Sequence, residues 1–247
     1  MGESFGAFRI GADEAILPFV SSANIACGFH GGDPAVMRTT IASAQACRVA
    51  IGAHPGLPDL VGFGRRTMDV TPQEVYDLVV YQIGALLAFA RAAGTELRHV
   101  KPHGALYNMA AANAPLADAI ARAVRDVDPR FVLYALAGSQ LMAAGERAGL
   151  LTASEAFADR NYLADGSLVS RRRADALVTS ADDAVARAIR MVREGRIRSV
   201  DGPDVTLQVD TICIHGDGPH APEFASRLRK GLEQSGVTVA AIARTPA

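Results

Sequence analysis

The sequence predicts an α/β protein in which helices cover a parallel sheet. Strand-like segments alternate with helical patterns, and the strand-like segments are almost wholly apolar, as strands buried on both faces of a parallel sheet are. Several of them end in a histidine that Gly or Pro follows at once. Polar side chains at the C-terminal ends of several strands favour a closed or nearly closed barrel. No Gly-x-Gly-x-x-Gly turn opens a helix after a strand and no P-loop is present, which counts against a Rossmann fold.

Length and composition predict one large domain over residues 1–247, because the chain has 247 residues and 49% of them are hydrophobic. The 25 basic and 26 acidic residues are well mixed, which argues against nucleic-acid partners. Three cysteines without a Cys-x-x-Cys spacing argue against a disulfide framework and fit a reducing compartment. Charges run throughout residues 1–20, and apolar stretches such as Ile83–Ala93 are too short to span a membrane. We therefore expect a cytoplasmic protein without a membrane partner.

The first part of the chain predicts two strands that flank an amphipathic helix. A short helical turn over Asp13–Val20 precedes a strand over Ser22–His30. Asp33 and Pro34 are typical of the N-cap and first position of a helix, and the apolar residues that follow are spaced by three or four. A catalytic role for Asp33 fits its position equally well. The next strand is expected over Val49–His54.

The rest of the chain continues the alternation. A Gly- and Pro-rich loop over Pro55–Met68 is long enough to suggest function. Thr71-Pro-Gln-Glu74 has the pattern of a capping box and opens the longest helix, Pro72–Ala93. Further strands are expected over Arg98–His103, Phe131–Leu136, Leu151–Phe157, within Val205–Ile214 and over Val237–Ala243, and further helices over Pro115–Val127, Ser139–Ala148, Ala181–Arg193 and Pro222–Ser235.

Four of the six histidines, His30, His54, His103 and His215, stand where a strand ends. A single histidine at a strand end is more often structural than functional. Four at equivalent positions place four imidazoles at the same edge of the sheet, where they can act as acids or bases or bind a metal.

Lys101 lies two residues before His103, so both side chains face the same side of an ideal strand. A buried lysine is costly unless it meets an anion. It therefore binds substrate, pairs with a carboxylate inside the core, or reaches out to solvent. Tyr107 and Asn108 are expected on the following loop, where they can line the mouth of the site.

Other charged residues lie near strand ends. Glu155, Asp159 and Arg160 can serve as proton donor and anion clamp, or form a structural ion pair. The Arg65 and Arg66 pair can hold a substrate carboxylate through the guanidinium fork.

Two further features of the sequence bear on the site. Asp217 belongs to the last loop. Cys27 and Cys213 fit small buried hydrophobic residues better than nucleophiles, because both are expected within strands.

Six motifs together resemble the LamB/YcsF family over about Gly2 to Val239. They are Ser-Ala-Asn-Ile-Ala-Cys-Gly-Phe-His30, Gly-Ala-His54-Pro-Gly, Gly-Phe-Gly-Arg65-Arg66, Lys101-Pro-His103-Gly-Ala-Leu-Tyr107, Glu155-Ala-Phe-Ala-Asp159-Arg160 and Cys213-Ile-His215-Gly-Asp217. The resemblance implies a (β/α) barrel of the polysaccharide-deacetylase type with about seven parallel strands. It also implies one component of a 5-oxoprolinase that, with subunits B and C and ATP, hydrolyses the lactam of 5-oxo-L-proline to L-glutamate.

The resemblance and the residue patterns together define an expected site. We expect 5-oxo-L-proline to lie over the strand ends, with ATP consumed by the complex, although no nucleotide-binding loop is visible in this sequence. The alternatives are a stand-alone metal-dependent deacetylase or amidohydrolase and a non-catalytic substrate-binding subunit. The expected catalytic residues are His30, His54, His103, His215 and Asp159, and the expected substrate-binding residues are Lys101, Arg65, Arg66, Tyr107, Glu155, Arg160 and Asp217.

One departure from the family pattern affects the expected metal chemistry. Members of the family that this chain resembles usually begin with a strand reading roughly Asp-Leu-Asn-x-Asp-Leu-Gly-Glu, and here only Gly2–Gly6 of that region remains. We therefore expect the first strand and its acidic residues to be missing, through a late start codon or a barrel open at one edge. With the early aspartate of deacetylase-type barrels absent, the sequence leaves open whether the chain binds a divalent metal.

Overall fold

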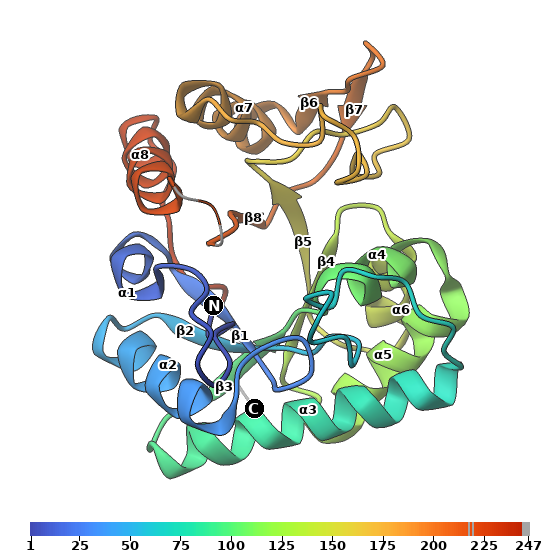
Figure 1. Cartoon of the computed structure of the whole chain (residues 1–247). Helices are drawn as coiled ribbons and strands as arrows, with labels where there is room; N and C mark the ends of the chain where they lie inside the picture. The colour runs from blue at the N-terminus through green and yellow to red at the C-terminus, as the bar shows by residue number, and fades with distance from the viewer. Residues whose placement is uncertain (217, 219, 244–247) are drawn as a thin grey trace.

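A curled sheet of six parallel strands forms the centre of the molecule. The computed structural model describes residues 1–216, 218 and 220–243. Within them the strand order is β1-β2-β3-β4-β5-β8, and Figure 1 shows the sheet curving into a partial barrel. The strands are β1 (Ser22–Ala26), β2 (Ala50–His54), β3 (Leu97–Val100), β4 (Val132–Leu136), β5 (Thr152–Phe157) and β8 (Thr211–Cys213), all paired in parallel. The predicted barrel-like α/β fold is confirmed, with six strands in place of about seven.

Helices cover the outer face of the sheet. The main core cluster packs side chains of the first four strands against α2, α3, α5 and α6, while α7 and α8 pack on each other beside β5 and β8 (Figure 1). The helices are α1 (Asp13–Ile16), the short 3-10 helix η1 (Leu17–Phe19), α2 (Pro34–Ala46), α3 (Pro72–Ala92), α4 (Gly104–Ala112), α5 (Ala114–Val127), α6 (Gln140–Arg147), α7 (Ala181–Glu194) and α8 (Ala221–Gln234).

The predicted helix starts are confirmed by their caps. Asp33 accepts hydrogen bonds from the backbone N–H groups of Ala35 and Val36, so its position before Pro34 is explained by capping. Thr71 and Glu74 form the complete capping box of α3. By length and composition α3 could cross a membrane, but its stripe of Val75, Val79, Ile83, Leu86 and Ala90 is buried in the core of this fold.

The N-terminal residues run along the free edge of β1. The Met1 amino group donates to the Asn24 carbonyl at 2.8 Å, and the Met1 carbonyl accepts from the Ala26 N–H at 3.0 Å. These two bonds have the pattern of a parallel strand pair. They carry Glu3 to the same edge of the sheet as the strand-end histidines, with its side chain 14% exposed. The retained Glu3 therefore brings an acidic side chain close to His30 and His103.

Three other predictions of secondary structure need correction. Residues 237–243 form no strand, although Ile242 packs against Val132, Tyr134 and Ala153. The region Val205–Ile214 contains two strands, because β7 (Asp204–Thr206) pairs antiparallel with β6 (Arg196–Arg198), outside the main sheet. Tyr107 and Asn108 lie on α4 and not on a loop. The run of Ala, Leu and Met in α4 has high helix propensity, so the signal for this helix was present in the sequence.

Candidate active site

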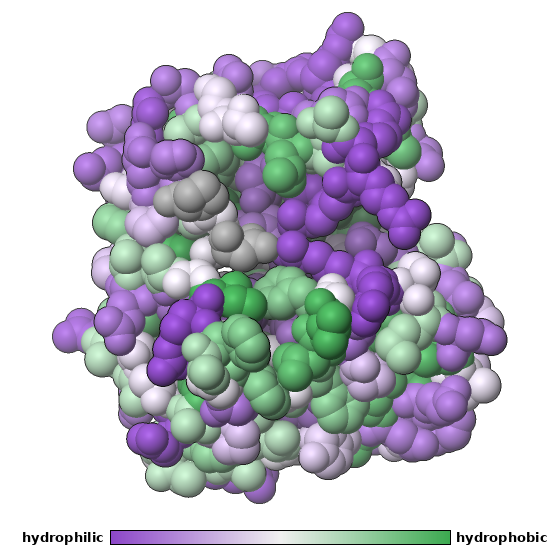
Figure 2. All heavy atoms as spheres, viewed as in Figure 1, coloured by the Kyte–Doolittle hydropathy of each residue, from purple (hydrophilic) through white to green (hydrophobic). Residues whose placement is uncertain are grey.

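A cleft of ≈1080 Å³ lies at the C-terminal ends of the strands. The side chains that line it include His54 at the end of β2, Lys101 after β3, Glu155 of β5 and His215 after β8. The face in Figure 2 is hollowed near its middle, with hydrophilic side chains dominating above and hydrophobic ones gathering below. The sequence predicted that polar side chains at several strand ends would lie together, and these residues all line one cleft.

Three of the four predicted histidines form one compact group with Glu3, here called the histidine cluster. His54 Nε2 lies 3.0 Å from His103 Nδ1, and the rings of His30 and His103 stack with centroids 3.7 Å apart. Glu3 Oε1 lies 3.6 Å from His30 Nε2 and 3.8 Å from His103 Nδ1. All three histidines are buried, so these contacts are shielded from solvent.

In His54 and in His103, the ring nitrogen that does not face the other histidine contacts a backbone carbonyl oxygen. His54 Nδ1 lies 2.6 Å from the Lys101 carbonyl oxygen, and His103 Nε2 lies 2.8 Å from that of Phe63. Phe63 has φ of 56°, a left-handed conformation that costs free energy for a bulky residue and is found most often at functional sites. At the next residue, Gly64, a Cβ atom would stand 2.8 Å from both His103 Cδ2 and His30 Cβ. The loop between β2 and α3 is therefore shaped to close over the histidines.

Burial dominates the charge states of the histidine cluster. It lowers the pKa of His54 and of His103 well below the ordinary value, and the neighbouring imidazoles lower both further. Burial also lowers the pKa of His30, although Glu3 opposes this. For Glu3, burial raises the pKa, but the N-terminal amino group and His30 outweigh it, so the pKa lies well below its usual range. At neutral pH the group is a carboxylate among neutral imidazoles.

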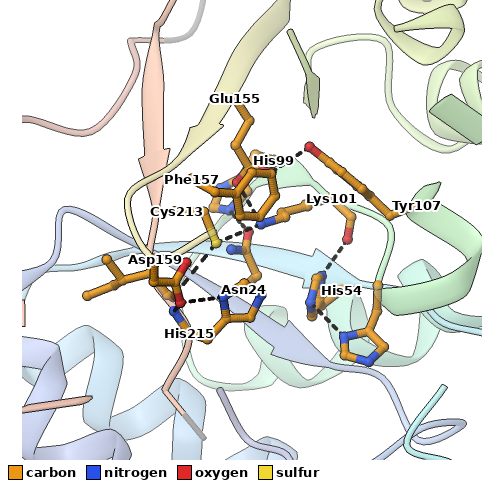
Figure 3. A network of polar contacts seen from close by, with 12 residues as sticks. Asn24, His54, His99, Lys101, Tyr107, Glu155, Phe157, Asp159, Cys213 and His215 are labelled. Carbon is orange, nitrogen blue, oxygen red and sulfur yellow. Dashed lines mark hydrogen bonds and ion pairs between the residues drawn. The ribbon is translucent and has the colours of Figure 1, made fainter. Parts of the chain in front are cut away.

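A second group, the lysine cluster, consists of Lys101, Tyr107, Glu155 and Cys213. Lys101 Nζ lies 2.6 Å from Glu155 Oε1 and 3.1 Å from Cys213 Sγ, and the Tyr107 hydroxyl donates to Glu155 Oε2 at 2.7 Å. Figure 3 shows these side chains converging, with Lys101 directly after β3, Tyr107 on α4, Glu155 on β5 and Cys213 on β8. The lysine is therefore paired with a carboxylate, which was one of the readings that the sequence left open.

Electrostatic coupling keeps the lysine cluster in a fixed charge state. Burial opposes the charged form of Lys101, but Cys213 and Glu155 outweigh it and raise its pKa. Burial raises the pKa of Cys213 to about 12 against the opposing effect of Lys101, and burial with Glu155 raises that of Tyr107. At neutral pH Lys101 is therefore an ammonium, Tyr107 a phenol and Cys213 a thiol.

The fourth predicted histidine, His215, pairs with Asp159 at the opposite side of the lysine cluster from His54 (Figure 3). Its Nδ1 lies 2.7 Å from Asp159 Oδ2, which also accepts from the His215 backbone N–H at 3.2 Å. Burial raises the pKa of Asp159, but the charge and hydrogen bonds of His215 outweigh it and lower the pKa below its usual value. An ionised carboxylate thus orients the ring and leaves Nε2 as the nitrogen that faces away from it.

The predicted arginines occupy different environments. Arg65 lines the cleft and lies over the Phe63 ring, whereas Arg66 also lines it but is ion-paired with Asp59. Arg160 is buried, its guanidinium donates to the backbone carbonyls of Val169 and Ala176, and burial with the nearby Arg171 lowers its pKa to about 10. Asp217, also predicted, lies outside the described residues.

Sequence reasoning missed two polar contributors. Glu3 was noted only as part of the Gly2–Gly6 remnant, and no strand pattern near it indicated that it would reach the histidines. Cys213 was interpreted as a hydrophobic residue within a strand, yet it is the last residue of β8 and its sulfur contacts Lys101. The signal was available, because Cys213 lies two residues before His215 just as Lys101 lies two before His103.

The sequence of this chain is similar to known proteins over nearly its whole length. The family model described as LamB/YcsF family matches residues 1–247. The chain belongs to the LamB/YcsF family. A Tolumonas auensis protein, named as the A subunit of 5-oxoprolinase, is 63% identical over 242 residues, covering 98% of this chain and 96% of that protein. A Bacillus licheniformis protein of the same name is 62% identical over 241 residues, covering 98% of this chain and 95% of that protein.

A solved structure shows the same fold. The crystal structure of the lactam utilization protein from Thermus thermophilus matches with a TM-score of 0.93 and 50% sequence identity, covering 98% of this chain and 97% of that chain. A TM-score of 0.93 over nearly both whole chains means that the two proteins share the partial barrel and its helices.

Proposed function

We propose that this chain is a subunit of an ATP-dependent 5-oxoprolinase, which opens the lactam of 5-oxo-L-proline to L-glutamate together with subunits B and C. The observation that carries the proposal is the identity of 62–63% over nearly the whole chain with proteins named as the A subunit of 5-oxoprolinase. The cleft supports a hydrolytic role for this chain, because it places acid–base groups and cations at one set of strand ends. We expect the protein to act in the cytoplasm, where ATP is available.

The proposed reaction requires water to add across a stable amide bond. Oxygen from water bonds to the ring carbonyl carbon, the carbon–nitrogen bond breaks, and the ring nitrogen takes up a proton to become the amino group of glutamate. Amide resonance makes the carbonyl a weak electrophile. Transfer of a phosphoryl group from ATP to the carbonyl oxygen would weaken that resonance and release ADP. A second water molecule then frees the phosphoryl group as inorganic phosphate, so the whole reaction consumes two water molecules.

The dyad of His215 and Asp159 is suited to act as the general base. The carboxylate accepts the Nδ1 proton at 2.7 Å, so Nε2 keeps its lone pair and can take a proton from water. His215 is 25% exposed at its side chain, which lets water reach the ring. The imidazolium formed at His215 can then give this proton to the departing nitrogen.

Cations in the cleft can bind the acidic substrate. Lys101 remains charged because its pKa is raised, and it can stabilise negative charge that develops on the carbonyl oxygen. Arg65 lines the same cleft and can hold the substrate carboxylate through its guanidinium fork. Arg66 also lines the cleft, where its guanidinium pairs with Asp59.

Glutamate release provides the test. The purified chain, subunits B and C together, and all three proteins are each incubated with 5-oxo-L-proline, with and without ATP. We expect glutamate only from the complete, ATP-supplied mixture. Equal release by subunits B and C without this chain would show that it does not catalyse ring opening. Deacetylation of an N-acetyl sugar or simple amide by the chain alone would instead favour the stand-alone hydrolase.

A further inference from the structure

The histidine cluster contains a contact that neutral imidazoles cannot make by themselves. His54 Nε2 and His103 Nδ1 face each other at 3.0 Å. The other nitrogen of each ring faces a backbone carbonyl oxygen, at 2.6 Å for His54 and 2.8 Å for His103. A carbonyl oxygen only accepts hydrogen bonds, so His54 Nδ1 and His103 Nε2 both carry the ring proton. The two facing nitrogens then present lone pairs to each other.

Two facing lone pairs repel unless a positive species lies between or beside them. The third group at this point is the carboxylate of Glu3, which is another acceptor and adds to the repulsion. Ligand atoms of Glu3, His54 and His103 all lie within 4.8 Å of one another. The convergence of three electron-pair donors is the arrangement in which proteins bind a cation.

His30 supplies a second, independent observation. Its side chain is buried, with 1% of the residue exposed, and neither ring nitrogen has a hydrogen-bond partner among the described residues. Nearly all buried polar atoms in proteins are satisfied, so an unpartnered buried imidazole indicates a missing ion or water. Its Nε2 lies 3.6 Å from Glu3 Oε1, beside the proposed ligand set, where it can orient the carboxylate.

We propose that His54 Nε2, His103 Nδ1 and the Glu3 carboxylate bind a divalent transition-metal cation, with zinc as the best-fitting ion. Two imidazoles and one carboxylate form a borderline donor set that suits zinc and related metals, whereas calcium and magnesium prefer oxygen ligands alone. Two nitrogens bound to one zinc ion lie about 3.3 Å apart, close to the separation seen here. Such a cation would supply Lewis-acid polarisation of a bound oxygen atom.

Backbone contacts hold the two histidine ligands in the orientation that cation binding requires. The Lys101 and Phe63 carbonyls fix the tautomers and ring orientations of His54 and His103, as outer partners of metal-binding histidines do. Glu3, His54 and His103 all line the cleft, and three protein ligands are one fewer than the four of a closed structural zinc site. The inference concerns cation binding by this chain alone and does not depend on the proposed lactam chemistry.

The chief rival is a proton shared between His54 and His103, balanced by Glu3. Metal binding by the isolated full chain separates the two. Tag-free protein is stripped with a chelator, reloaded with Zn²⁺ or Co²⁺, and assayed for metal content and affinity in competition with a chromophoric chelator. We expect one tightly bound cation per chain and, for Co²⁺, the visible absorption of a low-coordinate nitrogen and oxygen site.

Variants locate the cation. Glu3→Gln, which preserves side-chain shape, and His103→Asn should each weaken affinity by more than about 100-fold, and His30→Asn by about 10- to 100-fold. The exposed His220, which makes no side-chain cap hydrogen bond, provides the matched control, and His220→Asn should leave affinity unchanged. Failure of the wild-type chain to bind either metal, or unchanged affinity in Glu3→Gln, overturns the proposal.

A measurement on the unmodified protein covers the case in which a variant does not fold. Histidine ¹⁵N spectra of the stripped protein should show His54 protonated at Nδ1 and His103 at Nε2, and added Zn²⁺ should shift the two opposite nitrogens. A proton shared between the rings, with no shift on adding Zn²⁺, supports the rival and contradicts metal binding.

Discussion

The histidine cluster and the lysine cluster lie in one cleft but satisfy their polar atoms in opposite ways. In the lysine cluster, the ammonium of Lys101 meets the Glu155 carboxylate at 2.6 Å, and the Tyr107 hydroxyl donates to the other carboxylate oxygen at 2.7 Å. In the histidine cluster, two ring nitrogens face each other at 3.0 Å with their protons directed elsewhere. The polar atoms of the lysine cluster are satisfied within the protein itself. The facing nitrogens of the histidine cluster need a bound cation.

This difference indicates that the lysine cluster contributes mainly to stability and the histidine cluster mainly to ligand binding. The complete group is assembled by folding, and its ammonium and carboxylate are already paired with each other. The incomplete group is held open by backbone carbonyls and by the β2–α3 loop, at the cost of the left-handed Phe63. Mutations in the lysine cluster should therefore affect stability first, and mutations in the histidine cluster should affect ligand binding first.

Removing the partner of Lys101 should have the largest effect on stability. Glu155→Gln leaves a buried ammonium without its carboxylate, and we expect the free energy of unfolding to fall by about 3–5 kcal/mol in urea titrations. The exposed pair of Arg147 and Asp118 is the control, since Asp118→Asn should cost about 1 kcal/mol or less. If Glu155→Gln is no worse than Asp118→Asn, the lysine cluster does not carry a structural charge pair.

A smaller effect is expected from filling the space above the histidines. In Gly64→Ala the new methyl group lies too close to His103 and His30, and φ of +63° is itself unfavourable for alanine. Gly149→Ala is matched, because its φ is +75° and nothing lies within 4 Å of its Cβ position. The control should lose about 1–2 kcal/mol of stability from backbone strain alone.

Comparing the two glycine variants isolates the contact with the histidines. Gly64→Ala should lose about 1–3 kcal/mol more than Gly149→Ala, and only Gly64→Ala should lower Zn²⁺ affinity. Equal stabilities and equal Zn²⁺ affinities would show that the loop does not shape the histidine cluster.

The smallest effect concerns the reactivity of one thiol. Burial raises the pKa of Cys213 to about 12, and the thiolate is the reactive form, so Cys213 should react slowly with iodoacetamide at neutral pH. Exposed Cys47 should account for the fast reaction, and Cys47→Ser should abolish it. Fast alkylation of Cys213 in native Cys47→Ser would mean that Lys101 stabilises a thiolate instead of pairing with Glu155.

The sequence predicted the elements of this cleft better than the contacts within it. Apolar strand patterns and helix caps such as Thr71 and Asp33 are local signals, and they located the strand ends that bring His54, Lys101 and Glu155 together. The separation of His215 from the other three histidines was not predictable, because it depends on the curvature of the sheet.

Long-range contacts explain what else was missed. Glu3 reaches His103 across 100 positions of the chain through backbone bonds between Met1 and β1, which no periodicity reveals. Arg66 was predicted to bind an anion, and nothing in the sequence indicated that it would pair with Asp59. The pairing of β6 with β7 outside the main sheet likewise depends on tertiary packing, since both strands are only three residues long.

The most direct test of the central claim, that ring opening takes place in the cleft of this chain, is glutamate release by the complex with subunits B and C carrying His215→Asn. His215 is partly exposed, so the substitution should leave folding and assembly intact, and the exposed His220→Asn is the matched control. We expect His215→Asn to slow ATP-dependent glutamate release by at least about 100-fold and His220→Asn to leave it unchanged. Wild-type rates from an assembled His215→Asn complex would contradict the account.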